Sequence, residues 1–243
     1  MIAHGRIDGA LLVAPDFSHA DLSEAVAETC TITDASFDGA VLCGARFVHC
    51  RLVRCAFAHA DLREALFEDC TLSDPATQTG ANFAFSRLDE ARFRRCELIH
   101  ARFERADLYA ADFEECNLLG ARFARARFHR TFGRKVVRAA VRLAACNLEL
   151  ADLAGANLAG CALSGCRLRE TDLSGADLRG ADLRGADLFH AVLDAARLTD
   201  ADLRDGDLSG LDRRRLTDHQ GMKINAAQQW QLLGAMGVDV DAD

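Results

Sequence analysis

The sequence is poor in proline, tryptophan and tyrosine, and it contains no long hydrophobic run. Its 243 residues include two prolines, one tryptophan and one tyrosine. No apolar stretch approaches the ~18–20 residues that cross a membrane, and the first residues lack the apolar core and cleavage site of a signal peptide. We therefore expect a soluble, cytoplasmic protein without a membrane partner.

An excess of positive charge is also missing. The formal net charge is −8, although 27% of the residues are charged. Proteins that bind nucleic acid through its backbone neutralise phosphates with lysine and arginine. The charge balance therefore predicts that the protein makes no direct contact with nucleic acid.

Recognisable catalytic motifs are absent too. We find no glycine-rich phosphate loop, no nucleophile elbow and no paired-carboxylate site outside the repeat described below. The eight histidines are scattered and suggest no metal site or catalytic base. We expect a protein that is not an enzyme and that needs no cofactor or metal.

What the sequence has instead is a period of five residues. The stretch TDLSGADLRGADLRGADLFH, Thr171 to His190, repeats one unit four times: a small residue, Asp, Leu and two further residues, often polar or glycine. Neither the 3.6-residue period of a helix nor the two-residue period of a strand produces this pattern. Glycine is frequent at the last position of the unit, which indicates corners with positive φ.

The same unit, with Phe or Leu at its centre, runs from about Gly5 to Asp212. The chain in this respect resembles the pentapeptide-repeat proteins, whose motif is A(D/N)LXX. The resemblance implies an all-β solenoid, a right-handed quadrilateral β-helix with four pentapeptides in each coil. Each coil then holds about 20 residues and rises by about 4.8 Å, the spacing of neighbouring β-strands.

The spacing of cysteines and phenylalanines tests this coil length. Cys30, Cys50 and Cys70 follow one another at intervals of one such coil, but Cys96, the next of the series, comes six positions too late. Phe and Leu alternate at the unit centres before and after this interval, and both series continue in phase once six residues are removed. We therefore predict that residues 75–80 leave the coil as a protruding loop.

A second irregular segment spans residues 131–140. It keeps the five-residue count but places Gly133 and Arg138 at the inward, central position. Because an unpaired guanidinium inside an apolar coil costs several kcal/mol, either this coil bulges outward or Arg138 leaves the core. We expect an irregular coil near the wall from which the first loop leaves.

Residues 131–150 carry four basic side chains and one acidic one, between two acidic parts of the chain. The positive charge is either part of a binding surface or belongs to a poorly formed coil with solvated side chains. The residues of this second candidate segment are Thr131, Phe132, Gly133, Arg134, Lys135 and Arg138.

Nine of the ten cysteines occupy the small, inward position of a unit, and Cys43 is the exception. A buried cysteine fills the space that alanine fills in other units, and a cytoplasmic protein keeps its thiols reduced. We therefore expect a set of small, buried, free thiols rather than disulfides or metal ligands.

Aspartate precedes the central leucine in much of the second half of the chain, and residues one coil apart should stack. Two interpretations stay open. Each aspartate accepts a local backbone hydrogen bond at a corner, or the stacked aspartates imitate duplex DNA, which carries one charge per ~1.7 Å of axis. The residues of these acidic rows are Asp152, Asp172, Asp177, Asp182, Asp187, Asp202 and Asp207.

The repeats end near residue 212, which divides the chain into a β-helix of residues 1–212 and a C-terminal part of residues 213–243. The open end of a β-helix is an exposed edge that needs a cap, and Asn225 can N-cap a helix that ends at Gly237. Its large apolar surface favours a homodimer; the alternative is a helix folded onto its own last coil. The residues of the expected dimer surface are Ala226, Trp230, Leu232, Leu233 and Met236.

Within the family, the chain resembles the quinolone-resistance (Qnr) group most closely. The stretch DPATQTGANF, Asp74 to Phe83, is similar to the first loop of that group, and QQWQLLGAMGVDV looks like its closing helix. TFGRKVVR falls where a second loop lies in the group, but it is shorter. The residues similar to the first loop are Pro75, Ala76, Thr77, Gln78, Thr79 and Gly80.

The resemblance to the Qnr group implies a function. It implies a rod-shaped homodimer that mimics DNA, binds the type II topoisomerases DNA gyrase and topoisomerase IV, and protects them from quinolones or related poisons. The loop at residues 75–80 would contact the topoisomerase. The alternative is a pentapeptide-repeat scaffold or interaction protein with a non-topoisomerase partner.

Overall fold

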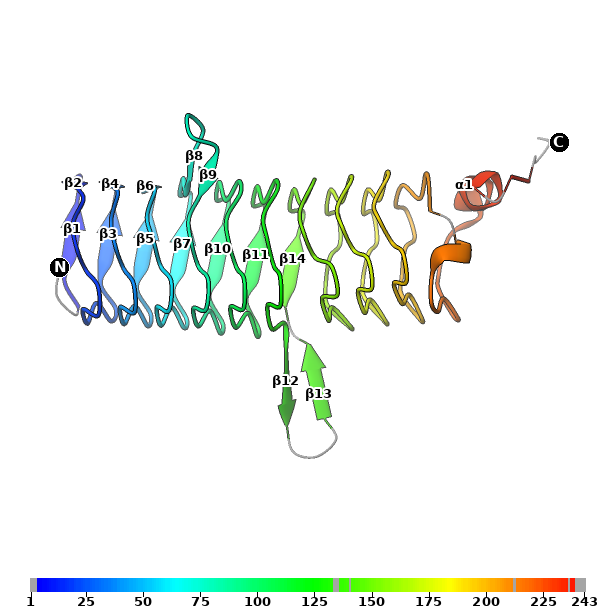
Figure 1. The fold of residues 1–243 in the computed structure, drawn as a ribbon, viewed down its shortest axis with the longest axis horizontal. Helices are drawn as coiled ribbons and strands as arrows, with labels where there is room; N and C mark the ends of the chain where they lie inside the picture. Colours follow the sequence, from blue (N-terminus) through cyan, green and yellow to red (C-terminus); the bar gives the residue numbers. More distant parts are fainter. Residues whose placement is uncertain (1–3, 133–135, 140, 212, 236, 239–243) are drawn as a thin grey trace.

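The computed structural model describes residues 4–132, 136–139, 141–211, 213–235 and 237–238. These residues form one long rod, with the two ends of the chain at opposite ends of the rod (Figure 1). Two hairpins project from the rod, and a short helix lies at its C-terminal end. No helix among the described residues is both long and apolar enough to cross a membrane.

Short parallel strands form two of the four walls. Arg6 pairs with Val26 on the first wall, and on a wall without named strands an isolated bridge joins Asp16 to Ser36, so both pairs step by one coil. The first wall contains β1 (Arg6–Asp8), β3 (Val26–Glu28), β5 (Arg46–Val48), β7 (Leu66–Glu68), β10 (Arg92–Arg94), β11 (Asp112–Glu114) and β14 (Arg142–Ala144). The second contains β2 (Leu11–Val13), β4 (Thr31–Thr33) and β6 (Arg51–Val53).

The core is a stack of side chains along the axis of the rod. Phenylalanines of two opposite walls form two columns, in which Phe37 and Phe57 lie parallel with their ring centroids 4.7 Å apart. The columns meet edge to face, as Phe37 and Phe47 do at 6.1 Å and 83°. Each such aromatic pair contributes about 0.5–1.5 kcal/mol of stability beyond what the burial of its surface contributes. The predicted right-handed quadrilateral β-helix is confirmed.

The corners between walls are tight turns. At one of them the Ala20 amide donates to the Phe17 carbonyl at 3.0 Å, across His19 with a φ of 58°. As the sequence predicts, corner glycines of the second half have positive φ, for example 65° at Gly175. Residues with side chains adopt the same conformation in the first half at a cost of about 1–2 kcal/mol each. The backbone hydrogen bonds to the neighbouring coils hold these corners in place.

The first hairpin leaves the rod between Leu72 and Ala81. Its strands β8 (Ser73–Asp74) and β9 (Thr79–Gly80) pair antiparallel. The Ala81 amide donates to the Leu72 carbonyl at 2.8 Å, the same bond that closes an ordinary corner, so the coil continues beneath the hairpin.

The core shows how much of the chain leaves the coil there. Phe57 stacks on Phe83 with the centroids 5.0 Å apart, although Phe83 comes six positions later in the sequence than one coil requires. Those six extra residues are therefore extruded. The hairpin replaces a two-residue corner, so it begins at Ser73, two residues before the predicted loop of residues 75–80.

The second hairpin stands where an irregular coil was expected. Its strands β12 (His129–Phe132) and β13 (Val136–Ala139) pair antiparallel, and the register around them steps from Asp112 to Arg142, one and a half coils along the sequence. Half a coil, which is two whole units, therefore leaves the walls. Because the inserted length is a multiple of five residues, the five-residue period of the sequence continues through the hairpin. The interpretation of residues 131–140 as an irregular coil is wrong for this reason. Of the predicted residues, Gly133, Arg134 and Lys135 lie outside the described residues.

The two hairpins project on opposite sides of the rod (Figure 1). The first follows the wall of Leu72 and the second follows the wall of Phe128. Once the six extruded residues are left out, Leu72 and Phe128 are two and a half coils apart along the wound chain. A separation of half a coil places two residues on opposite walls. The expectation that both interruptions lie near one wall is wrong.

Side-chain amides close the C-terminal end of the rod. The chain forms the 3-10 turns η1 (Arg213–Arg215) and η2 (Ala226–Gln228) and the helix α1 (Gln229–Ala235). Asn225 caps η2 in a capping box, as the sequence predicts for this residue. The buried Gln228 amide donates to the carbonyls of Leu203 and Gly206 at 2.7 and 2.8 Å. Those carbonyls therefore have hydrogen-bond partners at the exposed edge of the last coil.

Candidate functional site

A buried carboxylate fixes the base of hairpin β8–β9. The Asp74 side chain is 6% exposed and accepts a hydrogen bond from Arg54, one coil earlier, at 2.6 Å. Arg54 also binds Asp34 through two bonds of 2.6 and 2.8 Å. The Arg54 guanidinium holds the pKa of the Asp74 carboxyl below its usual value, and the Ala76 amide donates to the same carboxylate at 3.0 Å. The hairpin is therefore held at a fixed place on its wall.

The return strand of this hairpin depends on a glycine. A Cβ atom at Gly80 would lie 2.4 Å from backbone atoms of His100 and Ala101, which no side-chain movement can relieve. Gly80 thus lets the strand lie directly against the next coil. The other five predicted loop residues, Pro75 to Thr79, are exposed.

A polar pocket of about 430 Å³ lies beside the hairpin. The hairpin supplies one group of lining residues and the adjacent wall supplies the other. No carboxylate is among them, so the pocket carries positive charge from two arginines. The lining residues are Gln78, Thr79 and Gly80 from the hairpin and Asn82, His100, Arg102 and Arg122 from the coils.

The pocket opens onto a group of four exposed arginines on one wall, here named the basic wall: Arg102, Arg105, Arg122 and Arg125. Arg102 and Arg122 pair in the register of one coil, and Arg102 contacts Glu104 at 3.2 Å. Arg105 lies over the exposed ring of Phe85, 5.4 Å from its centroid. In the described part of the chain, Arg122 and Arg125 have no ion-pair partner.

Hairpin β12–β13 is tied to the rod by a different cluster. The Arg130 guanidinium binds Asp89, lies 3.3 Å from Asp107 and stands over the Tyr109 ring at 5.0 Å. The side chains of Asp89 and Asp107 are 6% and 9% exposed, and Arg127 also binds Asp107 at 2.9 Å. The first strand of this hairpin is therefore anchored to two nearly buried carboxylates.

All seven aspartates of the predicted acidic rows form local hydrogen bonds with the backbone at the corners. Each accepts a hydrogen bond from the amide two residues further on, at 2.9–3.3 Å. The stacking expected for residues one coil apart is present on three walls, so the aspartates form three short columns instead of one continuous stripe. The stacked pairs are Asp152 with Asp172, Asp182 with Asp202, and Asp187 with Asp207.

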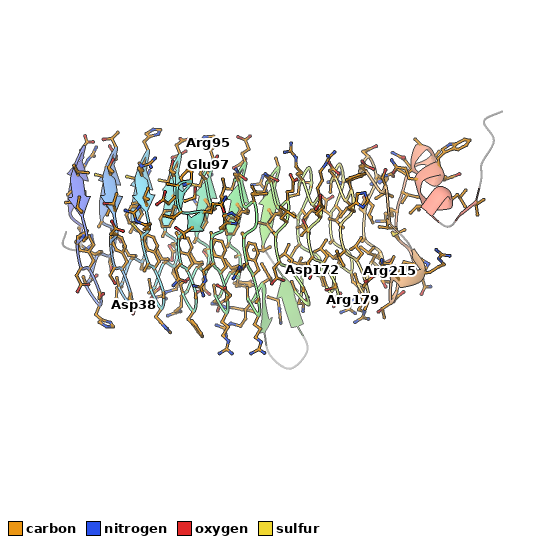
Figure 2. The ribbon with its side chains drawn as sticks, turned by 45° about the horizontal axis from the view of Figure 1, so that its top comes forward. Asp38, Arg95, Glu97, Asp172, Arg179 and Arg215 are labelled. Carbon is orange, nitrogen blue, oxygen red and sulfur yellow. The ribbon has the colours of Figure 1, made fainter. Side chains whose placement is uncertain are left out.

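Arginines offset much of this negative charge. Arg179, which projects from the rod in Figure 2, donates to Asp177 at 2.7 Å. Arg204 donates to Asp202 at 2.9 Å and holds the pKa of that carboxyl at about 2. Corresponding pairs join Arg184 to Asp182 and Arg169 to Asp187.

The cysteines line the interior, and all ten are free. Most of them form a column in which each thiol donates to a backbone carbonyl of the preceding coil, as Cys116 does to Phe93 at 3.3 Å. Nine are buried and Cys43 is half-buried, as predicted. Burial raises the pKa of Cys55 to about 11 and that of Cys161 to about 12. Among the described residues, no cluster of three or more His, Cys, Asp or Glu side chains could hold a metal ion.

Two family models together match most of the chain. The model of pentapeptide repeats matches residues 10–47, 146–185 and 181–212, and that of a pentapeptide repeat region matches residues 45–123. The chain belongs to the pentapeptide-repeat family. The stretch between the matches contains hairpin β12–β13, which interrupts the repeat.

Among solved structures, this pentapeptide-repeat protein is similar to QnrB1, a plasmid-mediated fluoroquinolone resistance protein. Full-length QnrB1 has a TM-score of 0.77 and 26% identity, over 96% of this chain and 100% of QnrB1. Two trypsin-treated QnrB1 variants have TM-scores of 0.74 and 0.72 at 25% and 24% identity, over 98% and 100% of this chain and 100% of theirs. A search of curated proteins found no match. The chain is a Qnr-like pentapeptide-repeat protein.

The apolar residues of the predicted dimer surface lie in η2 and α1 of this Qnr-like protein and differ in how far they are exposed. Leu232 is half-buried and packs against the core of its own rod. Ala226 and Trp230 are exposed, Trp230 by 45%, and Leu233 is half-buried. Met236 lies outside the described residues.

Four features of the Qnr-like protein were missed from the sequence. The pocket and the basic wall could have been found by aligning ARFER and ARFAR, residues 101–105 and 121–125, which stack one coil apart. The clamp of Asp89 and Asp107 around Arg130 had no such signal, because Arg130 belongs to residues that leave the coil. The burial of Gln228 also follows only from the position of the cap.

Proposed function

We propose that this Qnr-like protein binds a type II topoisomerase, DNA gyrase or topoisomerase IV, and protects it from quinolones or related poisons. The observation that carries the proposal is the likeness to QnrB1, which extends over the whole of that fluoroquinolone resistance protein. The proposal assigns the topoisomerase contact to hairpin β8–β9. Asp74 fixes the base of this hairpin and Gly80 lets its second strand lie against the next coil. A rod with a purely structural role needs no such hairpin.

The acidic rows have a secondary part in this proposal. Four of the seven aspartates are paired with arginine, so less negative charge is available for mimicry of duplex DNA than the sequence suggests. Asp152, Asp172 and Asp207 have no arginine partner among the described residues and are the charges available to a basic surface. DNA mimicry therefore supports binding, while the hairpins supply contacts that DNA does not have.

A homodimer formed through the C-terminal helix completes the proposal. Trp230 is a large apolar side chain that is nearly half exposed beside the end of the rod. Large exposed aromatic side chains are typical of contact surfaces between subunits. Two rods joined at this end would form one longer rod with a hairpin β8–β9 on each half.

A supercoiling assay with purified gyrase and ciprofloxacin tests the proposal. The intact protein is expected to restore supercoiling in the presence of the drug. Deletion of residues 75–80 leaves Ser73 and Asp74 as an ordinary two-residue corner, so this variant should keep the fold and lose protection. An intact protein that neither binds gyrase nor changes its activity would refute the proposal and favour a scaffold with another partner.

A further inference from the structure

The pocket beside hairpin β8–β9 has a charge opposite to that of the whole chain. The net charge is −8, but the pocket is lined by two arginines, a histidine and neutral polar side chains. Like charges held together at one place raise the local potential and favour an oppositely charged ligand. The pocket therefore suits an anionic group.

The shortage of ion-pair partners for the arginines of the pocket supports this conclusion. Elsewhere on the rod, arginines such as Arg54 and Arg95 already hold carboxylates through two or more hydrogen bonds. Arg122 has no such partner in the described part of the chain, and Arg102 has only the carboxylate of Glu104 at 3.2 Å. A guanidinium offers a planar pair of donors that matches a carboxylate.

The surroundings limit the size of the ligand. The wall that carries Arg102 and Arg122 continues along the rod with Asp152 and Asp172, one and two coils further on. A long polyanion such as duplex DNA would meet these carboxylates, whereas a short acidic stretch of polypeptide would end before them. At the corner that follows this wall, Arg105 and Arg125 extend the positive surface.

The far edge of the basic wall offers an apolar contact. Phe85 is 46% exposed at a corner with a φ of 61°, stacks on His59 at 4.9 Å and lies beneath Arg105. Polypeptide ligands combine charged and apolar side chains in this way, and an exposed aromatic ring is a common anchor for them.

We propose that the pocket and the basic wall bind a short acidic segment of the partner protein, with one carboxylate seated between Arg102 and Arg122. Gln78, Thr79 and Asn82 supply further polar contacts from the hairpin and its exit. The identity of the partner rests on the proposed function, but the acidic chemistry of the segment rests on this surface alone. Hairpin β8–β9 would then form one side of the binding site for the acidic segment, in addition to projecting from the rod.

Fluorescence anisotropy with a labelled oligoglutamate peptide tests the chemistry on the full-length protein. The double variant Arg102→Gln/Arg122→Gln should bind the peptide about tenfold more weakly for each arginine lost, and Arg122→Lys should lie between it and the unchanged protein. Arg46→Gln is the matched control, because Arg46 is exposed on β5 and has no ion pair in the described part of the chain. Equal binding by the double variant and the control would overturn the inference.

A labelled DNA duplex in the same assay separates the two kinds of polyanion. We expect the peptide to bind more tightly than the duplex. Tighter binding of the duplex, lost in the double variant, would overturn the inference in favour of a nucleic-acid site.

Gyrase binding then separates the inference from the proposed function. If the arginine variants bind gyrase normally while deletion of residues 75–80 abolishes binding, the inference fails and the proposed function stands. If the intact protein binds the acidic peptide through Arg102 and Arg122 but does not bind gyrase, the proposed function fails and the acidic site stands. Thermal unfolding monitored by circular dichroism verifies that the exposed substitutions leave the fold intact.

Discussion

The guanidinium of Arg130 lies 3.3 Å from the carboxylate of Asp107, across the junction between hairpin β12–β13 and the preceding coil. The same guanidinium binds Asp89, and both carboxylates are nearly buried. A hairpin formed from two extra repeat units is thus fixed to the rod at its first strand. This anchor and the Arg54–Asp74 pair of the other hairpin use the same chemistry on opposite sides of the rod.

Replacing Arg130 tests the anchor. Arg130→Gln should lower the free energy of unfolding by about 1–3 kcal/mol, because it leaves Asp89 nearly buried with only a distant contact to Arg87. It should also make hairpin β12–β13 more sensitive to limited proteolysis than the rod. Arg127→Gln removes a more exposed partner of Asp107 and should cost less than about 1 kcal/mol. Equal effects of the two substitutions in urea unfolding would contradict the anchoring role of Arg130.

Replacing Gly80 tests the close contact of hairpin β8–β9 with the next coil. Gly80→Ala should shift the hairpin and weaken partner binding, because the new Cβ would meet backbone atoms at 2.4 Å. Gly234→Ala is the control, since a Cβ has open space there and alanine favours a helix by about 1 kcal/mol. Thermal unfolding should show a loss of stability for the first variant and none for the second. A neutral Gly80→Ala would show that the hairpin does not need this approach.

The thiols should be protected and should make stability depend on alkaline pH. In the native protein, only Cys43 should react with Ellman's reagent at about pH 8, and slowly because partial burial raises the pKa of its thiol, whereas all ten should react fully after denaturation. Burial raises the pKa of Cys55 and Cys161 to about 11 and about 12, so the unfolded chain loses these protons first as the pH rises. The free energy of unfolding should therefore fall between about pH 9 and pH 12. Urea unfolding at several pH values measures this, and a constant value across that window would contradict it.

The single tryptophan reports the proposed dimer. Trp230 is exposed in one chain, so its emission maximum should move to longer wavelength as dilution separates a homodimer. Trp230→Ala should give the mass of one chain in sedimentation equilibrium, while Leu232→Ala should mainly destabilise the cap because Leu232 packs on its own core. A single-chain mass for the unchanged protein at high concentration would exclude the dimer.

The register of the rod could be predicted in detail from the sequence. The inward positions repeat every five residues, so the alternation of Phe and Leu and the lengthened step from Cys70 to Cys96 located the six extruded residues. Local counting failed at residues 131–140, because an insertion of two whole units keeps the period and hides the departure from the wall. The pairing of Asp112 with Arg142 and that of Asn117 with Asn147, each one and a half coils apart in the sequence, reveal it.

The outward side chains were less predictable. Each aspartate before a central leucine forms the corner bond that its local sequence favours, as Asp172 does with the Ser174 amide. Whether its charge remains available depends on an arginine that comes from the same unit for Asp202 and from the preceding coil for Asp187. The acidic rows therefore looked more like DNA in the sequence than they do on the folded rod.

By itself, then, the sequence determined the coil, its core columns and the step at the first hairpin, because a five-residue repeat fixes which side chains point inward at every unit. The tertiary structure alone decided that the hairpins leave on opposite sides, that Arg130 reaches two nearly buried carboxylates and that Arg102 and Arg122 face the first hairpin across a pocket. These features depend on contacts between coils. In such contacts the partner of a side chain lies about a coil or more away in the sequence. The geometry of the folded rod, and not the repeat, selects that partner.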